Sequence, residues 1–438
     1  MLLLALLGAG SSKVAGIALA AANPNDDLTP VGAQRTGNTD GSIPAWNGGL
    51  TQPPAGWAPG MPYIDPYSAD QPLYVISGSN AEQHAEHLSP GQMALLRRYP
   101  EFRMPVYPTR RSAALPKSVT DRVRSQVGNA RLDGFGLSNP GRSTIPFPLP
   151  KNGQEAIWNH LMRYLGNGIE RSFHSFAVRP NGDFLKVGFH ELRVYDENFD
   201  EPMDNRLFSY LGYFTGPAEL RGTIFLVHEP VDPARQPRNA WIYNAGQRRV
   251  RRAPDMAYDN AQDGSEGFAV VDQYDGFNGA PDRYDWTLLG KKEMLVAYNG
   301  YLMGDKNIRY DQIIRRHTVN ADLMRYEKHR VWAIEAKLKP GQSHIYARRV
   351  FYLDEDSWSV LLDDAYDSRG QLWRTGIHGL VQYYDALVPW YRFELWHDLS
   401  NGAYVLTGLD NEMKGSTKFG AKGRAADFKP DALRRMGK

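Results

Sequence analysis

Four arginines lie within five consecutive positions, residues 248–252, just after the strand-like run 241–243. Guanidinium groups bind carboxylates and phosphates through paired hydrogen bonds. This run could therefore form a basic rim that receives an acidic headgroup at the mouth of a pocket. The alternative is a solvated edge strand, whose charges oppose aggregation and pair with nearby aspartates. The rim residues in the first interpretation are Arg248, Arg249, Arg251 and Arg252.

Two other polar groups have residue types that bind metals. His84 and His87 could place two imidazoles on one helix face, but a zinc site needs a third and usually a fourth ligand, which the neighbouring sequence does not offer. The acidic runs 354–356 and 363–364 lack the glycine and closing glutamate of a twelve-residue calcium loop. We interpret them as turn acids, and we predict no metal and no cofactor.

Catalytic motifs are also missing from the sequence. It contains no Gly-x-Ser-x-Gly elbow, no phosphate-binding loop and no dinucleotide fingerprint. It contains no cysteine, which excludes disulfides, thiolate metal sites and cysteine catalysis. Glu191, Glu335 and Glu394 lie in strand-like runs and could pair as acid and base only if the fold brought them together. We expect no catalytic residues and a protein that is not an enzyme; an enzyme acting on a lipid or glycan is the weaker alternative.

The clearest secondary-structure pattern lies between residues 326 and 366. Residues 331–338 alternate between an apolar and a mostly polar side, as in a half-buried strand. The turn 339–342, with Pro340 and Gly341 at its centre, and a second break at 354–356 lead into two further runs. Strands joined by such short breaks are antiparallel neighbours. The pattern predicts an antiparallel meander with one apolar face.

Aromatic and aliphatic side chains on these predicted strand faces could contact a hydrophobic ligand. In the alternative interpretation, these side chains form an ordinary sheet core packed under helices. A carrier would differ from this only in that the protein leaves part of the apolar face unfilled. The predicted ligand-binding residues are Trp241, Tyr243, Trp286, Leu288, Trp332, Ile334, Ala336 and Leu338.

Length and composition suit one large sheet domain with an elaboration. The chain has 438 residues, a net charge of +2 and 12% aromatic residues, so charge gives no reason to expect nucleic acid. Residues 1–22 have two apolar runs, interrupted by residues 11–13, and a small-x-small site at 18–20, which predicts an export signal. Residues 23–150 hold 18 of the 29 prolines and predict an extended wrap with short helices. Residues 151–412 form the main domain, and 413–438 a loose basic tail.

Two segments within the main domain are candidates for a movable cover. Residues 151–165 carry an apolar stripe at helical spacing, and Gly166 ends the predicted helix. Residues 255–285 are long, acidic and glycine-rich, as lids in sheet proteins often are.

Several long motifs resemble a known family. The strand at 241–244 with its arginine run is similar to periplasmic proteins related to the LolA/LolB lipoprotein carriers. The more specific motifs resemble the domain-of-unknown-function family DUF1329, whose members are described as outer-membrane-lipoprotein-sorting-like. The resemblance spans about residues 28–412, and these motifs lie at 28–33, 146–151, 284–294, 330–341 and 344–358.

The resemblance implies a mainly β (α+β) fold: a large curved antiparallel sheet, forming an unclosed half-barrel with helices on its concave side. It also implies a periplasmic location and a role alongside an outer-membrane β-barrel protein and a resistance-nodulation-division-type transporter. The family has no agreed catalytic residues, so the resemblance assigns none to this sequence. We expect a non-catalytic carrier or chaperone for a lipid, a lipid-modified protein or an apolar small molecule moving between membranes. The alternative is a structural accessory subunit of such a barrel or transporter.

Overall fold

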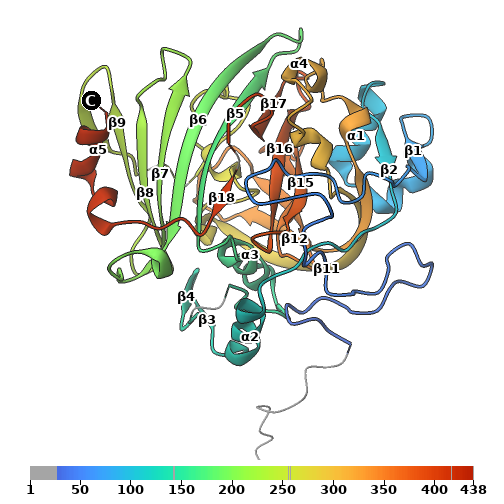
Figure 1. The fold of residues 1–438 in the computed structure, drawn as a ribbon, viewed down its shortest axis with the longest axis horizontal. Coiled ribbons are helices and arrows are strands. Elements are labelled where there is room, and N and C mark those ends of the chain that lie inside the picture. Colours follow the sequence, from blue (N-terminus) through green and yellow to red (C-terminus); the bar gives the residue numbers. More distant parts are fainter. Residues whose placement is uncertain (1–26, 142–143, 255, 257, 416, 438) are drawn as a thin grey trace, which may run out of the picture.

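The computed structural model describes residues 27–141, 144–254, 256, 258–415 and 417–437, so the predicted export signal lies outside the described residues. Two antiparallel meanders, β5 to β10 and β11 to β17, make up most of one sixteen-stranded sheet, and β17 pairs with β5 to join them. Figure 1 shows the first meander at the left and the second at the right. The end strands β10 and β11 are not paired with each other in the described residues, so the sheet stays open. This confirms the predicted curved, unclosed, mainly β fold.

The strand bounds follow the chain order of the two meanders. The first contains β5 (Gly168–Val178), β6 (Phe184–Tyr195), β7 (Arg206–Gly216), β8 (Ile224–Pro230), β9 (Asn239–Asn244) and β10 (Arg249–Arg252). The second contains β11 (Tyr284–Ala297), β12 (Tyr326–Leu338), β13 (Arg348–Asp354), β14 (Val360–Tyr366), β15 (Leu372–Tyr383), β16 (Val388–Asp398) and β17 (Tyr404–Leu409). The short strands are β1 (Tyr74–Ile76), β2 (Met104–Val106), β3 (Arg131–Asp133), β4 (Gly136–Ser138) and β18 (Lys418–Phe419).

The α-helices are few and short. They are α1 (Pro90–Arg98), α2 (Lys117–Gln126), α3 (Gly153–Met162), α4 (Tyr310–Ile313) and α5 (Pro430–Met436). Among the described residues, none of the helices has the length and apolar character needed to cross a bilayer. The segment predicted as a helix at 151–165 is α3, whose first turn is capped by the Asn152 side chain accepting from the Glu155 N–H at 2.8 Å.

The central meander is antiparallel, as predicted, with β12 paired to β13 and β13 to β14. The turn after β12 has a Gln342 N–H to Lys339 carbonyl hydrogen bond of 3.1 Å and a φ of +79° at Gly341, as a type II turn requires. On one face of β12, Ile334 and Ala336 are fully buried against Ile157 of α3. The helix therefore covers the apolar face of the meander.

The opposite face of β12 is also buried, although the alternation predicts a mostly polar side. Val331 and Ala333 are fully buried in the largest apolar cluster, together with Leu95 and Leu96 of α1. The N-terminal segment (residues 27–116) supplies α1 and therefore covers this second face. Figure 1 shows this segment, in blue to cyan, at the right, where it carries α1 beside the second meander. A strand pattern of period two cannot reveal a cover that comes from 230 residues earlier in the chain.

The interpretation of residues 363–364 as turn acids is wrong. Asp363 and Asp364 lie inside β14 and are fully buried. Asp364 accepts hydrogen bonds from Ser89 Oγ and from the Gly91 N–H, both at 3.2 Å, at the start of α1. This carboxylate therefore accepts hydrogen bonds from the N-terminus of α1, where backbone N–H groups lack partners within the helix, and it is not exposed to solvent.

The C-terminal tail is ordered rather than loose. Leu433 of α5 and Phe428 before it are buried in a cluster with Leu226 and Tyr243 of the first meander. Figure 1 places α5 beside β8 and β9. The basic composition of the tail gave no indication that Phe428 and Leu433 would be buried. Burial of these two side chains offsets the conformational entropy that the tail loses when it orders.

We expect Leu433→Ala to destabilise the protein by about 2–5 kcal/mol, because the side chain is fully buried. The matched control is Met436→Ala on the same helix, where the side chain is 43% exposed and the change should cost less than about 0.5 kcal/mol. Urea unfolding followed by tryptophan fluorescence measures both. Equal unfolding midpoints for the two variants would show that the tail does not pack as described.

Candidate ligand-binding cavity

A cavity of about 320 Å³ lies on one face of the first meander. Its walls are mostly apolar, and the phenylalanine rings contact one another edge to face, with Phe189 and Phe214 centroids 5.0 Å apart. The lining side chains alternate along their strands, as side chains on one face of a sheet must. The wall residues on β5 to β9 are Phe173, Ser175, Val187, Phe189, Phe208, Tyr210, Phe214, Phe225, Val227 and Ile242.

The cover of this cavity is irregular chain that we call the cover segment (residues 258–280). Its backbone passes over the wall, and Asn260, Gln262, Val271, Tyr274 and Asn278 contribute lining atoms. This is most of the passage that the sequence predicts as a lid. Movement of the cover segment stays a prediction. The segment lies over the cavity, which is the position that a lid requires.

The far side of the cavity is built from buried ion pairs. Arg193 of β6 donates to Asp275 of the cover segment at 2.9 Å, and Arg163, which follows α3, donates to the same carboxylate. Arg238 pairs with Glu229 of β8 at 2.5 Å. Although burial alone would raise it, the two arginines hold the pKa of Asp275 below its ordinary range.

Burial raises the pKa of Glu229, and Arg238 opposes that effect. The polar groups on this side of the cavity are therefore charged pairs that fix the cover segment to the sheet. An apolar pocket with a few fixed polar groups is the usual form of a small-molecule site.

The eight predicted ligand-binding residues lie elsewhere. Trp241 and Tyr243 are on the opposite face of β9 from Ile242, in the cluster under α5. The six others pack in the cluster under α3: Trp286, Leu288, Trp332, Ile334, Ala336 and Leu338. They would contact a ligand only if α3 moved, so their assignment stays a prediction.

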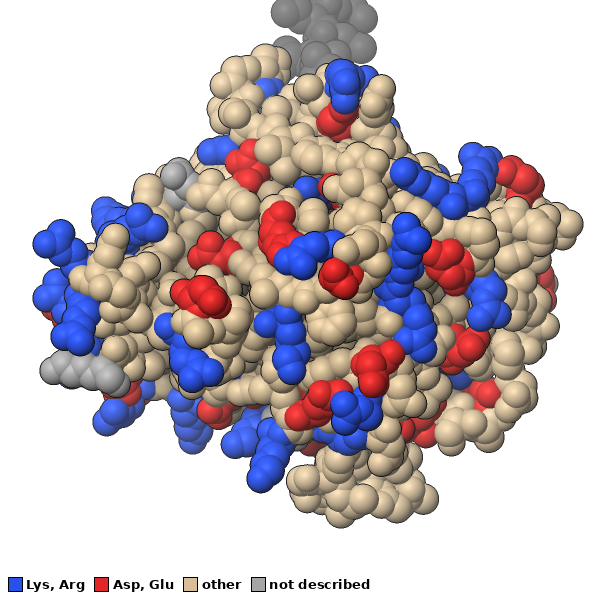
Figure 2. All heavy atoms as spheres, turned by 90° about the horizontal axis from the view of Figure 1, so that it is seen from above, with Lys and Arg blue, Asp and Glu red and all other residues tan. Residues whose placement is uncertain are grey.

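The arginine run is divided between two faces by the alternation of β10. Arg251 pairs in register with Ile242 and lines the cavity, whereas Arg252 pairs with Trp241 and stacks over its ring at 6.0 Å. Arg248 and Arg249 are exposed. Figure 2 shows Lys and Arg gathered at the left end of the molecule, the end that carries β9 and α5 in Figure 1. One of the four predicted rim residues is thus at the cavity.

The remaining polar candidates do not assemble a catalytic pair. Glu191 pairs with Arg171 at 2.5 Å, and Glu335 pairs with Arg348 at 3.0 Å. Glu394 binds His378 at 3.2 Å and accepts the Gly276 N–H at 2.8 Å. His87 hydrogen-bonds the Glu293 carbonyl at 2.9 Å, and His84 stacks on Tyr74. Each of these groups has a separate structural partner.

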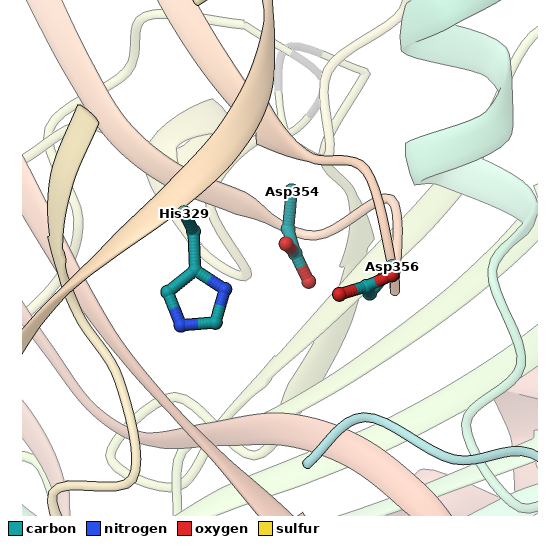
Figure 3. A group of neighbouring side chains, drawn as sticks. All are labelled: His329, Asp354 and Asp356. Atoms are coloured by element: carbon teal, nitrogen blue, oxygen red, sulfur yellow. The ribbon is translucent and has the colours of Figure 1, made fainter. Parts of the chain in front are cut away.

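A buried group with metal-binding residue types lies between the N-terminal segment and the second meander. Figure 3 shows His329, Asp354 and Asp356 converging, with ligand-type atoms within 4.8 Å of one another. Both oxygens of Asp356 accept from Arg111, at 2.7 and 2.9 Å. The His329 Nε2 contacts Glu327 at 3.0 Å. Because the guanidinium supplies the positive charge that a cation would bring, we interpret the group as an ionic anchor for the N-terminal segment.

Sequence reasoning missed the cavity because its walls are not distinctive as sequence. The runs 173–178, 184–189 and 223–228 are recognisable as strands, and the last two have apolar residues at alternate positions: Val187 and Phe189, and Phe225 and Val227. That recurrence identifies one face of a sheet. It does not indicate which face a neighbouring segment fills, because the cover comes from a different part of the chain.

The sequence and structure have recognisable relatives. The family model described as "Protein of unknown function (DUF1329)" matches residues 75–434, which confirms the resemblance stated above. The uncharacterized protein PA3922 of Pseudomonas aeruginosa is 43% identical over 425 residues, covering 95% of this chain and 93% of that protein.

Solved structures of similar fold are more distant in sequence. A domain from Vibrio parahaemolyticus, provisionally named an outer membrane lipoprotein-sorting protein, is 15% identical with a TM-score of 0.46, covering 65% of this chain and 98% of its own. A DUF1329 protein from Desulfovibrio piger is 16% identical with a TM-score of 0.42, covering 61% and 92%.

We predict a pH-dependent effect of Asp354, whose Oδ1 has no hydrogen-bond partner among the described residues. Burial, followed by repulsion from Asp356, raises the pKa of Asp354 to about 6 from an ordinary 3.8. A raised carboxyl pKa contributes stability that is complete below pH 3.8 and is lost as the pH rises through 6. Asp354→Asn should therefore gain stability relative to wild type as the pH rises from 4.5 to 8, by about 2 kcal/mol at most.

Melting temperatures across this pH range measure the effect, and asparagine keeps an acceptor for Ser357 and Tyr298. The control is Asp311→Asn, whose side chain is 72% exposed and whose curve should run parallel to wild type. Parallel curves for Asp354→Asn as well would mean that the buried carboxylate is not destabilised in this way.

Proposed function

This chain belongs to the DUF1329 family, and we propose that it is a non-catalytic carrier or chaperone that holds a hydrophobic ligand in the periplasm. The ligand would be a lipid, a lipid-modified protein segment or an apolar small molecule in transit between membranes. The observation that carries the proposal is the phenylalanine-lined cavity of about 320 Å³. Protein interiors are otherwise close-packed, so an apolar void of this size needs an explanation.

The energetics suit a carrier that retains its ligand and then releases it. Each buried methylene contributes about 0.8 kcal/mol, so a chain of ~12 carbons would gain up to ~10 kcal/mol before ordering costs. The cavity volume is near the lower end for small-molecule sites, which favours one chain over a multi-chain lipid. The remaining acyl chains of a larger ligand would have to lie outside the cavity or displace the cover.

Entry and exit would occur at the cover segment. Asn260, Ala261 and Asp263 at the cavity margin are exposed, and so is Arg251 on the facing strand. The other end of the segment is held by Asp275 through its two arginines. We therefore propose that the part near residues 260–264 opens, while the part near Asp275 stays attached. We further propose that the ligand is transferred to an outer-membrane β-barrel or an envelope transporter.

We expect Ile242→Trp to weaken binding of the neutral fluorescent probe N-phenyl-1-naphthylamine by about 10-fold or more, because the larger ring occupies the cavity. The matched control is Trp241→Phe, one residue along the same strand on the face under α5, which should bind the probe like wild type. Fluorescence titration measures both affinities.

The same titration tests the strand face that the sequence predicts. If Trp332→Leu abolished probe binding and Ile242→Trp did not, the ligand would lie under α3 instead of in the cavity. Wild-type protein that binds no apolar probe, and that shows no co-purifying lipid by native mass spectrometry, would contradict the carrier function itself. A structural accessory role would then be the better description.

A further inference from the structure

Arg193 places a buried positive charge beside the mostly apolar wall of the cavity. Its side chain lines the cavity and is 96% buried, and its guanidinium lies 5.0 Å from the centroid of the Phe208 ring. A charge in such surroundings costs free energy unless hydrogen bonds and an opposite charge compensate it. The number of hydrogen-bond acceptors and anionic groups around the Arg193 guanidinium therefore shows whether the protein alone compensates its charge.

The partners of Arg193 are too few for a buried guanidinium. It donates through Nη1 to Asp275 Oδ2 at 2.9 Å and interacts with the neutral Tyr195 hydroxyl, and its Nε–H has no acceptor among the described residues. Asp275 is shared, because Arg163 binds its other oxygen and the Trp390 indole N–H donates to it at 2.8 Å. Two guanidinium groups thus depend on one carboxylate.

The other carboxylates near this end of the cavity are committed elsewhere. Glu229 is paired with Arg238, and Glu191 with Arg171. Glu394 is bound by His378 and by the backbone N–H of Gly276. Arg193 therefore lacks a second anionic partner, and the cavity is where a ligand could supply one.

At the mouth of the cavity, by contrast, the arginine charge is compensated. Arg251 lines the cavity there, but Asp263 lines it too and interacts electrostatically with Arg251, and both residues are exposed. Water and a neighbouring carboxylate already compensate the rim charge. The demand for an anion is consequently greater at Arg193 than at the rim.

We propose that the ligand is a single-chain amphiphile with one negative charge, such as a fatty acid, bound with its carboxylate against Arg193 and its chain among the phenylalanines. This inference rests on the proposed carrier function and names its ligand class. The carboxylate would accept from the guanidinium and relieve the sharing of Asp275. A charge-assisted hydrogen bond of this kind gives about 10- to 100-fold in affinity.

The test compares ligands that differ only in the headgroup. Dodecanoate, dodecanol and methyl dodecanoate compete with N-phenyl-1-naphthylamine for the wild-type protein, and dodecanoate should compete at about 10-fold lower concentration or better. Arg193→Gln should remove this preference while the probe still binds. Arg193→Lys keeps the charge and should restore part of the preference, and it reports on folding if the glutamine variant is unstable.

Two arginines of β10 serve as controls. Arg252→Gln, on the face away from the cavity, should leave the preference unchanged. Arg251→Gln tests the rim: loss of the preference in this variant, with the Arg193 variants like wild type, would overturn the proposed orientation. Equal competition by the acid and the alcohol in wild type would overturn the ligand class. Probe binding with no preference leaves the carrier function standing, whereas no probe binding contradicts both.

Discussion

The buried carboxylate of Asp275 is the interaction on which the arrangement of the cavity depends. It lies in irregular chain, with a φ of +61°, and is 96% buried. Its partners come from three other elements: Arg163 after α3, Arg193 of β6 and Trp390 of β16. Removing a carboxylate from water is costly unless its partners are in place, so this residue links both meanders, the helix and the cover segment.

This link continues into the core of the second meander. Glu394 accepts the N–H of Gly276, next to Asp275, and binds His378, which also binds Asp363 of β14 at 3.0 Å. Although burial alone would lower it, hydrogen bonds to Asp363 and Glu394 raise the pKa of His378 to about 9. The imidazolium is therefore charged at neutral pH, and one end of the cover segment rests on a buried ionic network. The other end of the segment is held by partly exposed contacts: Arg179 pairs with Glu266, Arg283 pairs with Asp259 at 3.7 Å, and Arg374 donates to the Gly267 carbonyl at 2.7 Å.

The two meanders use the same kind of surface in opposite ways. In the second, α3 fills the apolar face and α1 fills the other, so the strands are buried on both sides. In the first, α5 fills one face, and the opposite face is spanned by a segment that has one short 3-10 helix (Val271–Gln273) and is otherwise irregular. A helix packs its side chains into a sheet surface, whereas an extended segment held by a few ion pairs can leave space beneath it. That difference explains why the cavity lies in the first meander although the strand pattern is clearer in the second.

The sequence by itself determined the local structure. Alternation fixed β12 and its facing residues, Pro340 and Gly341 fixed the turn, and the apolar stripe after Asn152 fixed α3, because each depends on neighbours within one segment. Only the tertiary structure decided which faces were filled. Phe189 and Ile334 are equally apolar strand residues, yet one lines a cavity and the other is covered by a helix. The cover segment begins 69 residues after Phe189, and α3 ends 172 residues before Ile334, so a pattern within one strand cannot show which face another segment fills.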